Sequence, residues 1–138
     1  MEGTRPVRAR DVAAAVLVAL AIGHIILGAY MLSDPGSFFR EIGPFGVRND
    51  HYTRDAGTFT LALGIGFAVA ARWRGWRLGI VGYALVQYVL HTINHLVDIN
   101  KAHPHSAGPL DFASLAVTAT VLGWLLVRVL RDQRAATW

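Results

Sequence analysis

Cysteine is absent from the 138 residues of this chain. Its absence excludes disulfide bonds, thiolate metal sites, thiol redox chemistry and lipid anchors attached through cysteine. Charge is also scarce, because charged residues make up 16% of the chain, whereas hydrophobic residues make up 54% and the mean hydropathy is +0.40. A small soluble domain has too little interior to bury that much apolar surface. The composition therefore predicts one membrane domain over residues 1–138.

The apolar stretches also lack the two-residue alternation of strands, and an isolated strand cannot satisfy its backbone hydrogen bonds in lipid. Runs rich in Ala, Leu and Gly instead predict membrane-spanning helices at about residues 12–32, 51–71, 78–98 and 110–129. The second run reaches the roughly 17 to 20 residues that a bilayer requires only if the polar turn 51–55 belongs to the same helix. The predicted fold class is all-α, an integral membrane four-helix bundle.

Arginine is distributed unevenly around these four runs. Nine arginines flank the ends that would share one side of the membrane: Arg5, Arg8, Arg10, Arg72, Arg74, Arg77, Arg128, Arg131 and Arg134. Only four basic residues occupy the other two connections: Arg40, Arg48, Arg54 and Lys101. The positive-inside rule then places both termini in the cytoplasm. Topology and anionic lipid thus explain the net charge of +4, and we expect membrane lipid, not nucleic acid, as the partner.

The connection over residues 33–49 carries the turn signals Asp34-Pro35-Gly36 and Gly43-Pro44. Its apolar residues predict either a short helix on the bilayer surface or ordinary loop packing; they are Phe38, Phe39, Ile42 and Phe45. Four glycines permit close helix contacts within the bundle or between copies in a homo-oligomer: Gly64, Gly66, Gly79 and Gly82.

Polar residues gather in the half of the bundle that faces away from the cytoplasm, and all six histidines belong to this half. On the third helix they form a stripe about 100° wide, made of Gln87, His91, Asn94, His95 and Asp98. Similar stripes follow His51, Asp55 and Thr58 on the second helix and Asp111, Ser114 and Thr118 on the fourth, and the first helix has His24 alone. Ionisable groups in a membrane usually face the bundle interior or a wet cavity, so we expect the stripes to converge on an outward-facing pocket.

A metal site is the most specific interpretation of this pocket. The spacing His91-x-x-x-His95 puts two imidazoles on one helical face, and His51-x-x-x-Asp55 repeats the spacing on the next helix. The predicted ligands are therefore His51, Asp55, His91 and His95, with Asp98, His24 and Asp111 as second choices. Such ligands suit Zn, Fe or Cu, and the metal would support redox or hydrolytic chemistry on a lipid-soluble or small substrate.

Other interpretations remain open. His24 and His91 lie at similar depth and permit a haem between two helices, and His24 alone is typical of a histidine that bridges helices. A proton relay through His and Asp, or a polar headgroup site, is a further possibility. His103 and His105 are expected on the surface, and Asp111 is also a candidate helix N-cap. No phosphate loop, nucleophile elbow, zincin motif or dinucleotide fingerprint occurs, so no catalytic residue is assigned.

Several short motifs are shared with a known group of proteins. They are Asp34-Pro35-Gly36 after the first helix, Asn49-Asp50 and Arg54-Asp55-x-Gly57 opening the second, Leu61-Ala62-Leu63-Gly64 within it, the Arg-rich turn, and Asn94-His95-Leu96-x-Asp98 closing the third. In this layout the chain resembles the DoxX-like group of small four-helix bacterial membrane proteins over most of its length. The resemblance implies a bacterial plasma (inner) membrane location. It also implies, as the alternative to a metal site, a non-enzymatic accessory subunit that packs helices and docks a redox or other membrane partner.

Overall fold

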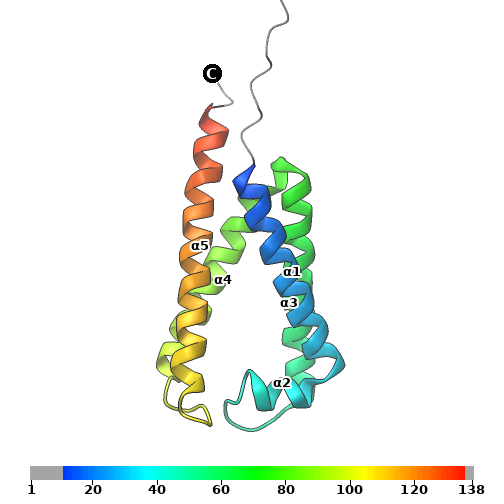
Figure 1. Cartoon of the computed structure of the whole chain (residues 1–138), viewed down its shortest axis with the longest axis vertical. Helices are drawn as coiled ribbons and strands as arrows, with labels where there is room; N and C mark the ends of the chain where they lie inside the picture. The colour runs from blue at the N-terminus through cyan, green and yellow to red at the C-terminus, as the bar shows by residue number, and fades with distance from the viewer. Residues whose placement is uncertain (1–10, 136–138) are drawn as a thin grey trace, which may run out of the picture.

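The computed structural model describes residues 11–135, and Arg5, Arg8 and Arg10 lie outside that range. Its helices are α1 (Val12–Ser33), α2 (Pro35–Glu41), α3 (Asp50–Arg72), the 3₁₀ helix η1 (Arg74–Trp76), α4 (Arg77–Val97) and α5 (Ala107–Ala135) (Figure 1). No strand occurs in this range, where the single β-bridge joins Phe45 to Ala102. The all-α prediction is confirmed, and the 33–49 connection does contain a short helix, α2.

Three helices are long and apolar enough to cross a membrane: α1, the helical stretch Arg74–Val97 that comprises η1 and α4, and α5. Helix α3 is not among them, although its 23 residues match the 22 of α1 in length. Its first two turns carry Asp50, Arg54 and Asp55, which shorten its apolar part. The polar turn 51–55 does belong to this helix, as the predicted second span requires.

Capping residues set the helix ends. The Asp11 carboxylate accepts a hydrogen bond from the Ala14 amide at 3.1 Å at the start of α1, and the Asn49 side chain accepts from two amides at the start of α3. Asp34 caps α2, whose first residue is Pro35. Helix α5 begins at Ala107, so Asp111 lies past its first turn and is not the N-cap that the sequence suggested.

The helices associate as two pairs, α1 with α3 and α4 with α5. The pairs lie close together at the end of the molecule that holds η1, the η1 end, and spread apart toward the end that holds α2, the α2 end (Figure 1). The largest fully buried side chains belong to the half near the η1 end, where all four long helices contribute to one core: Leu17, Phe67, Val81, Leu122 and Leu125. The pairs are thus packed together at one end and separated at the other.

Glycine sets the close approach of α1 and α3. A Cβ added at Gly28 would lie 2.6 Å from the Leu61 backbone nitrogen, and one at Gly64 would lie 2.8 Å from that of Ile25. Those distances leave no room for a side chain, so the two backbones touch at both positions. The prediction of close contact is confirmed for Gly64 and for Gly66, where an added Cβ would lie 3.2 Å from the Ile80 side chain, whereas Gly79 and Gly82 have open space around the Cβ position.

A buried arginine joins the two pairs at the η1 end. Arg77 is 4% exposed; its Nε donates to the Ala70 carbonyl at 3.1 Å and its guanidinium bonds both carboxylate oxygens of Asp11. Arg74 donates to the same carboxylate at 2.9 Å. The hydrogen bond from Arg77 holds the pKa of Asp11 below its usual value. This ion pair fixes the start of α1 against the start of α4.

Candidate functional site

A cavity of about 380 Å³ lies between the two helix pairs. All four long helices and Phe38 of α2 line it, and most of the lining is aliphatic or aromatic. The polar lining residues are His24, Thr60, Tyr83, Gln87, Tyr88 and His91. Because the core is confined to the η1 end, the diverging helices leave this space unfilled. An apolar cavity with a few polar groups is the usual form of a small-molecule site.

His24 is buried at one wall of the cavity, with 7% of its surface exposed. Its Nδ1 lies 2.7 Å from the Leu20 carbonyl, which can only accept, so Nδ1 carries the proton. Its Nε2 therefore accepts the hydrogen bond of the Tyr88 hydroxyl at 2.6 Å. Both ring nitrogens are engaged, and the Tyr88 bond links α1 to α4. His24 thus has the geometry of the helix-bridging histidine and offers no free nitrogen to a metal or a haem.

His91 and His95 lie on successive turns of α4, and their Nε2 atoms are 3.1 Å apart. His91 lines the cavity, whereas His95 is covered by the ring of Phe45, which meets it edge-on with 4.8 Å between ring centroids. The loop that carries Phe45 is held across the α2 end by the bridge to Ala102 and by the His103 amide, which donates to the Pro44 carbonyl at 3.2 Å. The predicted stripe on α4 is therefore turned toward the cavity at Gln87 and His91.

Three buried polar atoms near this stripe have no hydrogen-bond partner in the structure: Gln87 Oε1, His95 Nδ1 and Asp111 Oδ2. Asp111 near the start of α5 and His95 near the end of α4 belong to the paired helices α4 and α5, and their side chains are close enough for an electrostatic interaction. Unpaired buried polar atoms are costly and call for an explanation such as a bound group. Packing between the helices gives these three polar atoms no hydrogen-bond partner, and this is the main polar feature of the region that the fold does not explain.

His51 and Asp55, two of the four predicted ligands, are not part of this arrangement. Their side chains are 79% and 54% exposed and bond each other at 3.4 Å. Within residues 11–135 no three His, Asp or Glu side chains are grouped to hold a metal ion. Of the second choices, Asp98 pairs with Lys101 at 2.7 Å.

The rotation of α3 explains why the second stripe does not reach the cavity. Gly57 and Gly64 face α1 because only glycine permits that contact. At 100° per residue, this orientation turns Ala56, Thr60 and Leu63 to the cavity. His51 then falls on the opposite side of the helix from Thr60, whereas Asp55 lies one turn before the lining residue Phe59, at the edge of the cavity-facing side, with its side chain 54% exposed. The glycine spacing was visible in the sequence and could have fixed this orientation.

Tyr88 is a candidate site residue that the sequence patterns missed. It lies three residues before His91 and seven before His95, which places it beside the polar stripe of α4. That spacing was a usable signal, but tyrosine is also common at membrane interfaces. The remaining histidines, His103 and His105, are exposed on the α4–α5 connection, as predicted.

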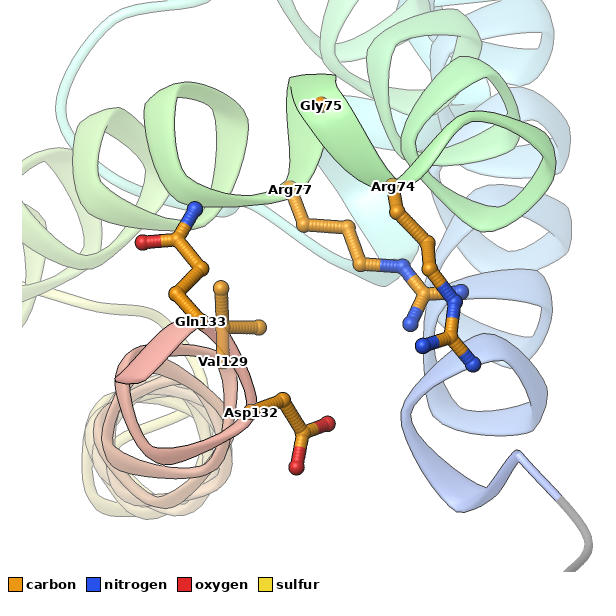
Figure 2. Close-up of a pocket in the computed structure, with 6 residues that line it drawn as sticks. All are labelled: Arg74, Gly75, Arg77, Val129, Asp132 and Gln133. Carbon is orange, nitrogen blue, oxygen red and sulfur yellow. The ribbon is translucent and has the colours of Figure 1, made fainter. Parts of the chain in front are cut away.

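A second pocket, of about 270 Å³, lies at the η1 end between η1 and α5. Figure 2 shows the side chains of Arg74 and Arg77 extending side by side, with Asp132 projecting from α5 into the same space. Both guanidinium groups already bond Asp11. The pocket is therefore bordered by the ion pair that joins the two helix pairs.

No family model, curated protein or solved structure matches this chain.

Proposed function

We propose that the chain crosses a bacterial plasma membrane four times, with both termini in the cytoplasm. Helix α3 is then the fourth span, since it lies along α1 and, at 1.5 Å per residue, its 23 residues reach roughly the 30 Å of a hydrocarbon core. Arg72, Arg74 and Arg77 gather at the η1 end, where α5 also finishes with Arg128, Arg131 and Arg134. A cytoplasmic η1 end follows from this bias, and it leaves the α2 end facing outward.

We infer that the function of this protein is to bind a lipid-soluble small molecule in the cavity between the helix pairs. The observation that supports it is the cavity of about 380 Å³ itself, whose lining is mostly apolar and carries His91 and Gln87 on one wall. Volumes of this order suit small ligands. A molecule dissolved in the bilayer suits such a cavity, because the four proposed spans that line it lie in the membrane.

The polar wall specifies the kind of headgroup. Gln87 Oε1 is buried and unpaired, so the complementary ligand atom is a hydrogen-bond donor. Tyr88 donates its hydroxyl to His24 and thereby leaves His91 as the neighbouring imidazole that can contact a ligand. The preferred ligand is thus an apolar molecule with a hydroxyl on a ring or chain, such as a phenol, a quinol or a lipid alcohol. The full proposal adds a bound metal ion that would assist chemistry on that molecule.

Binding is tested with 4-decylphenol, and decylbenzene serves as the matched compound without the hydroxyl. Thermal unfolding of the detergent-purified protein is followed with each compound at the same concentration. A ligand at about 100 times its Kd stabilises the folded state by roughly 2.7 kcal/mol, so 4-decylphenol is expected to raise the Tm by about 5 °C or more. Decylbenzene should raise it less, because it leaves Gln87 unpaired.

The variant Gln87→Leu should bind 4-decylphenol roughly 3- to 10-fold more weakly, which corresponds to the loss of one hydrogen bond. Gln133→Leu, at the η1 end, is the matched control and should bind like the original chain. Equal Tm shifts from both compounds, or an equal loss in both variants, would contradict the proposal.

The second candidate function is a non-enzymatic accessory subunit of the DoxX-like kind. The observation in its favour is the Tyr88–His24 bond, which uses a buried histidine purely to join two helices. Under this proposal the polar stripes pack helices and dock a partner, and neither decyl compound would raise the Tm selectively.

A further inference from the structure

The two Nε2 atoms of His91 and His95 face each other at 3.1 Å. A neutral imidazole carries one proton on its two nitrogens, so such a pair either shares one N–H or directs two lone pairs at a cation. The i, i+4 spacing on a helix keeps the two rings together, since residues four apart lie on one face. The same two atoms are therefore arranged as a two-imidazole ligand pair.

The unpaired atoms nearby favour the cation. His95 Nδ1 and Asp111 Oδ2 are both buried without a hydrogen-bond partner, and the two residues lie on the paired helices α4 and α5. A hydrogen bond between these two atoms would satisfy both. It would also place the His95 proton on Nδ1 and leave the Nε2 lone pair free. A carboxylate that holds the far nitrogen of a ligand histidine is a common feature of metal sites.

We propose that His91 and His95 bind one divalent transition-metal ion through Nε2, and that Asp111 is a positioning residue that orients His95. Imidazole ligands suit Zn and Cu, and the remaining coordination positions would be filled by water or by a molecule in the cavity that His91 lines. The Phe45 ring covers the His95 imidazole. The site deepens the proposed function, because it names the residues that would hold the metal ion, but binding of the ion does not require a ligand in the cavity.

This assignment changes the ligand set that the sequence predicted. His91 and His95 stay, Asp111 becomes an orienting group, and His51 and Asp55 are left out because they are exposed as a separate pair. His51-x-x-x-Asp55 nevertheless has the same spacing, which makes it a matched control for the effect of spacing alone.

The test is equilibrium dialysis of the purified protein against Zn²⁺ alone, followed by elemental analysis. The protein carries His103→Ala and His105→Ala to remove exposed imidazoles. One Zn²⁺ per chain is expected. His91→Ala and His95→Ala should each abolish stoichiometric binding, Asp111→Asn should weaken it about 10- to 100-fold, and His51→Ala should leave it unchanged. If an alanine variant unfolds, His91→Gln and His95→Gln, which keep the size and polarity, replace it.

Failure of the folded protein to bind Zn²⁺ would overturn the site, and so would binding that survives the loss of both histidines. Binding that depends on the histidines but not on Asp111 would overturn the role of Asp111. Gln87→Leu should keep full Zn²⁺ binding, so failure of the metal site and failure of the cavity proposal give different results.

Discussion

Tyr88 and His24 form a buried hydrogen bond between α4 and α1, and its removal should be costly. Tyr88→Phe deletes the only donor that reaches His24 Nε2 in the described residues and leaves a buried acceptor unpaired. Such a loss typically costs about 1 to 3 kcal/mol. The free energy of unfolding in detergent should fall by that amount, with a corresponding drop in Tm.

Tyr83→Phe is the control for this change, since Tyr83 also lines the cavity but is 64% exposed. It should change the stability by less than about 0.5 kcal/mol. A Tyr88→Phe variant as stable as Tyr83→Phe would mean that His24 finds another partner in the folded protein.

At the scale of single residues, the sequence predicted which side chains of α4 line the cavity better than it predicted their hydrogen-bond partners. The polar stripe on α4 was correct for Gln87 and His91, because the 3.6-residue period alone decides which residues share a face. The bond of His24 to Tyr88 was not predictable, since it depends on how α1 and α4 meet across 64 residues of sequence. Metal binding by His91 and His95 stays a prediction.

At the scale of elements, the contact of α1 with α3 depends on glycine. Gly28→Ala would place a methyl group 2.6 Å from the Leu61 backbone nitrogen, so the two helices must separate. In an open helix the same change stabilises by about 1 kcal/mol. Here it should instead destabilise by about 1 to 3 kcal/mol, the usual cost of overpacking, and thermal unfolding measures the difference.

Gly23→Ala is the matched control, because Gly23 belongs to the same helix and nothing lies within 4 Å of its Cβ position. It should be neutral or stabilising. If both variants raised the stability, the close packing of α1 on α3 would not exist in the folded protein.

The sequence predicted where the helices run along the chain, but it did not predict how α3 is rotated about its own axis. The predicted range 51–71 agrees with α3 (Asp50–Arg72), because length and apolar content decide where such a helix runs. The range 110–129 was too short for α5 (Ala107–Ala135), which continues past the apolar run into polar residues. The face that α3 turns to the cavity was predicted incorrectly, since polarity suggested His51 and Asp55 while glycine packing at Gly57 and Gly64 decided it.

At the scale of the whole molecule, the opening of the pairs toward the α2 end follows from where the large side chains lie. The fully buried residues, such as Phe67 and Leu122, hold the η1 end together with the Arg77–Asp11 ion pair. Toward the α2 end the same four helices present the polar stripe and the cavity, and the Phe45 loop connects the pairs there. One end therefore serves stability, and the other is available for binding.

The proposed topology can be mapped directly, because a chain without cysteine accepts single cysteines with no background labelling. Val47→Cys lies before α3, where Val47 is 93% exposed, and Gly75→Cys lies after it in η1. If α3 spans the membrane with the η1 end in the cytoplasm, a membrane-impermeant maleimide should label Val47→Cys in intact cells. It should label Gly75→Cys only after the membrane is permeabilised. His105→Cys, beyond α4, should behave like Val47→Cys.

Equal labelling of Val47→Cys and Gly75→Cys in intact cells would show that α3 does not cross, whereas a reversed pattern would keep four spans and invert the orientation. The distinction matters for the site, since only the outward orientation of the α2 end exposes the His91–His95 pair to metal ions from outside the cell.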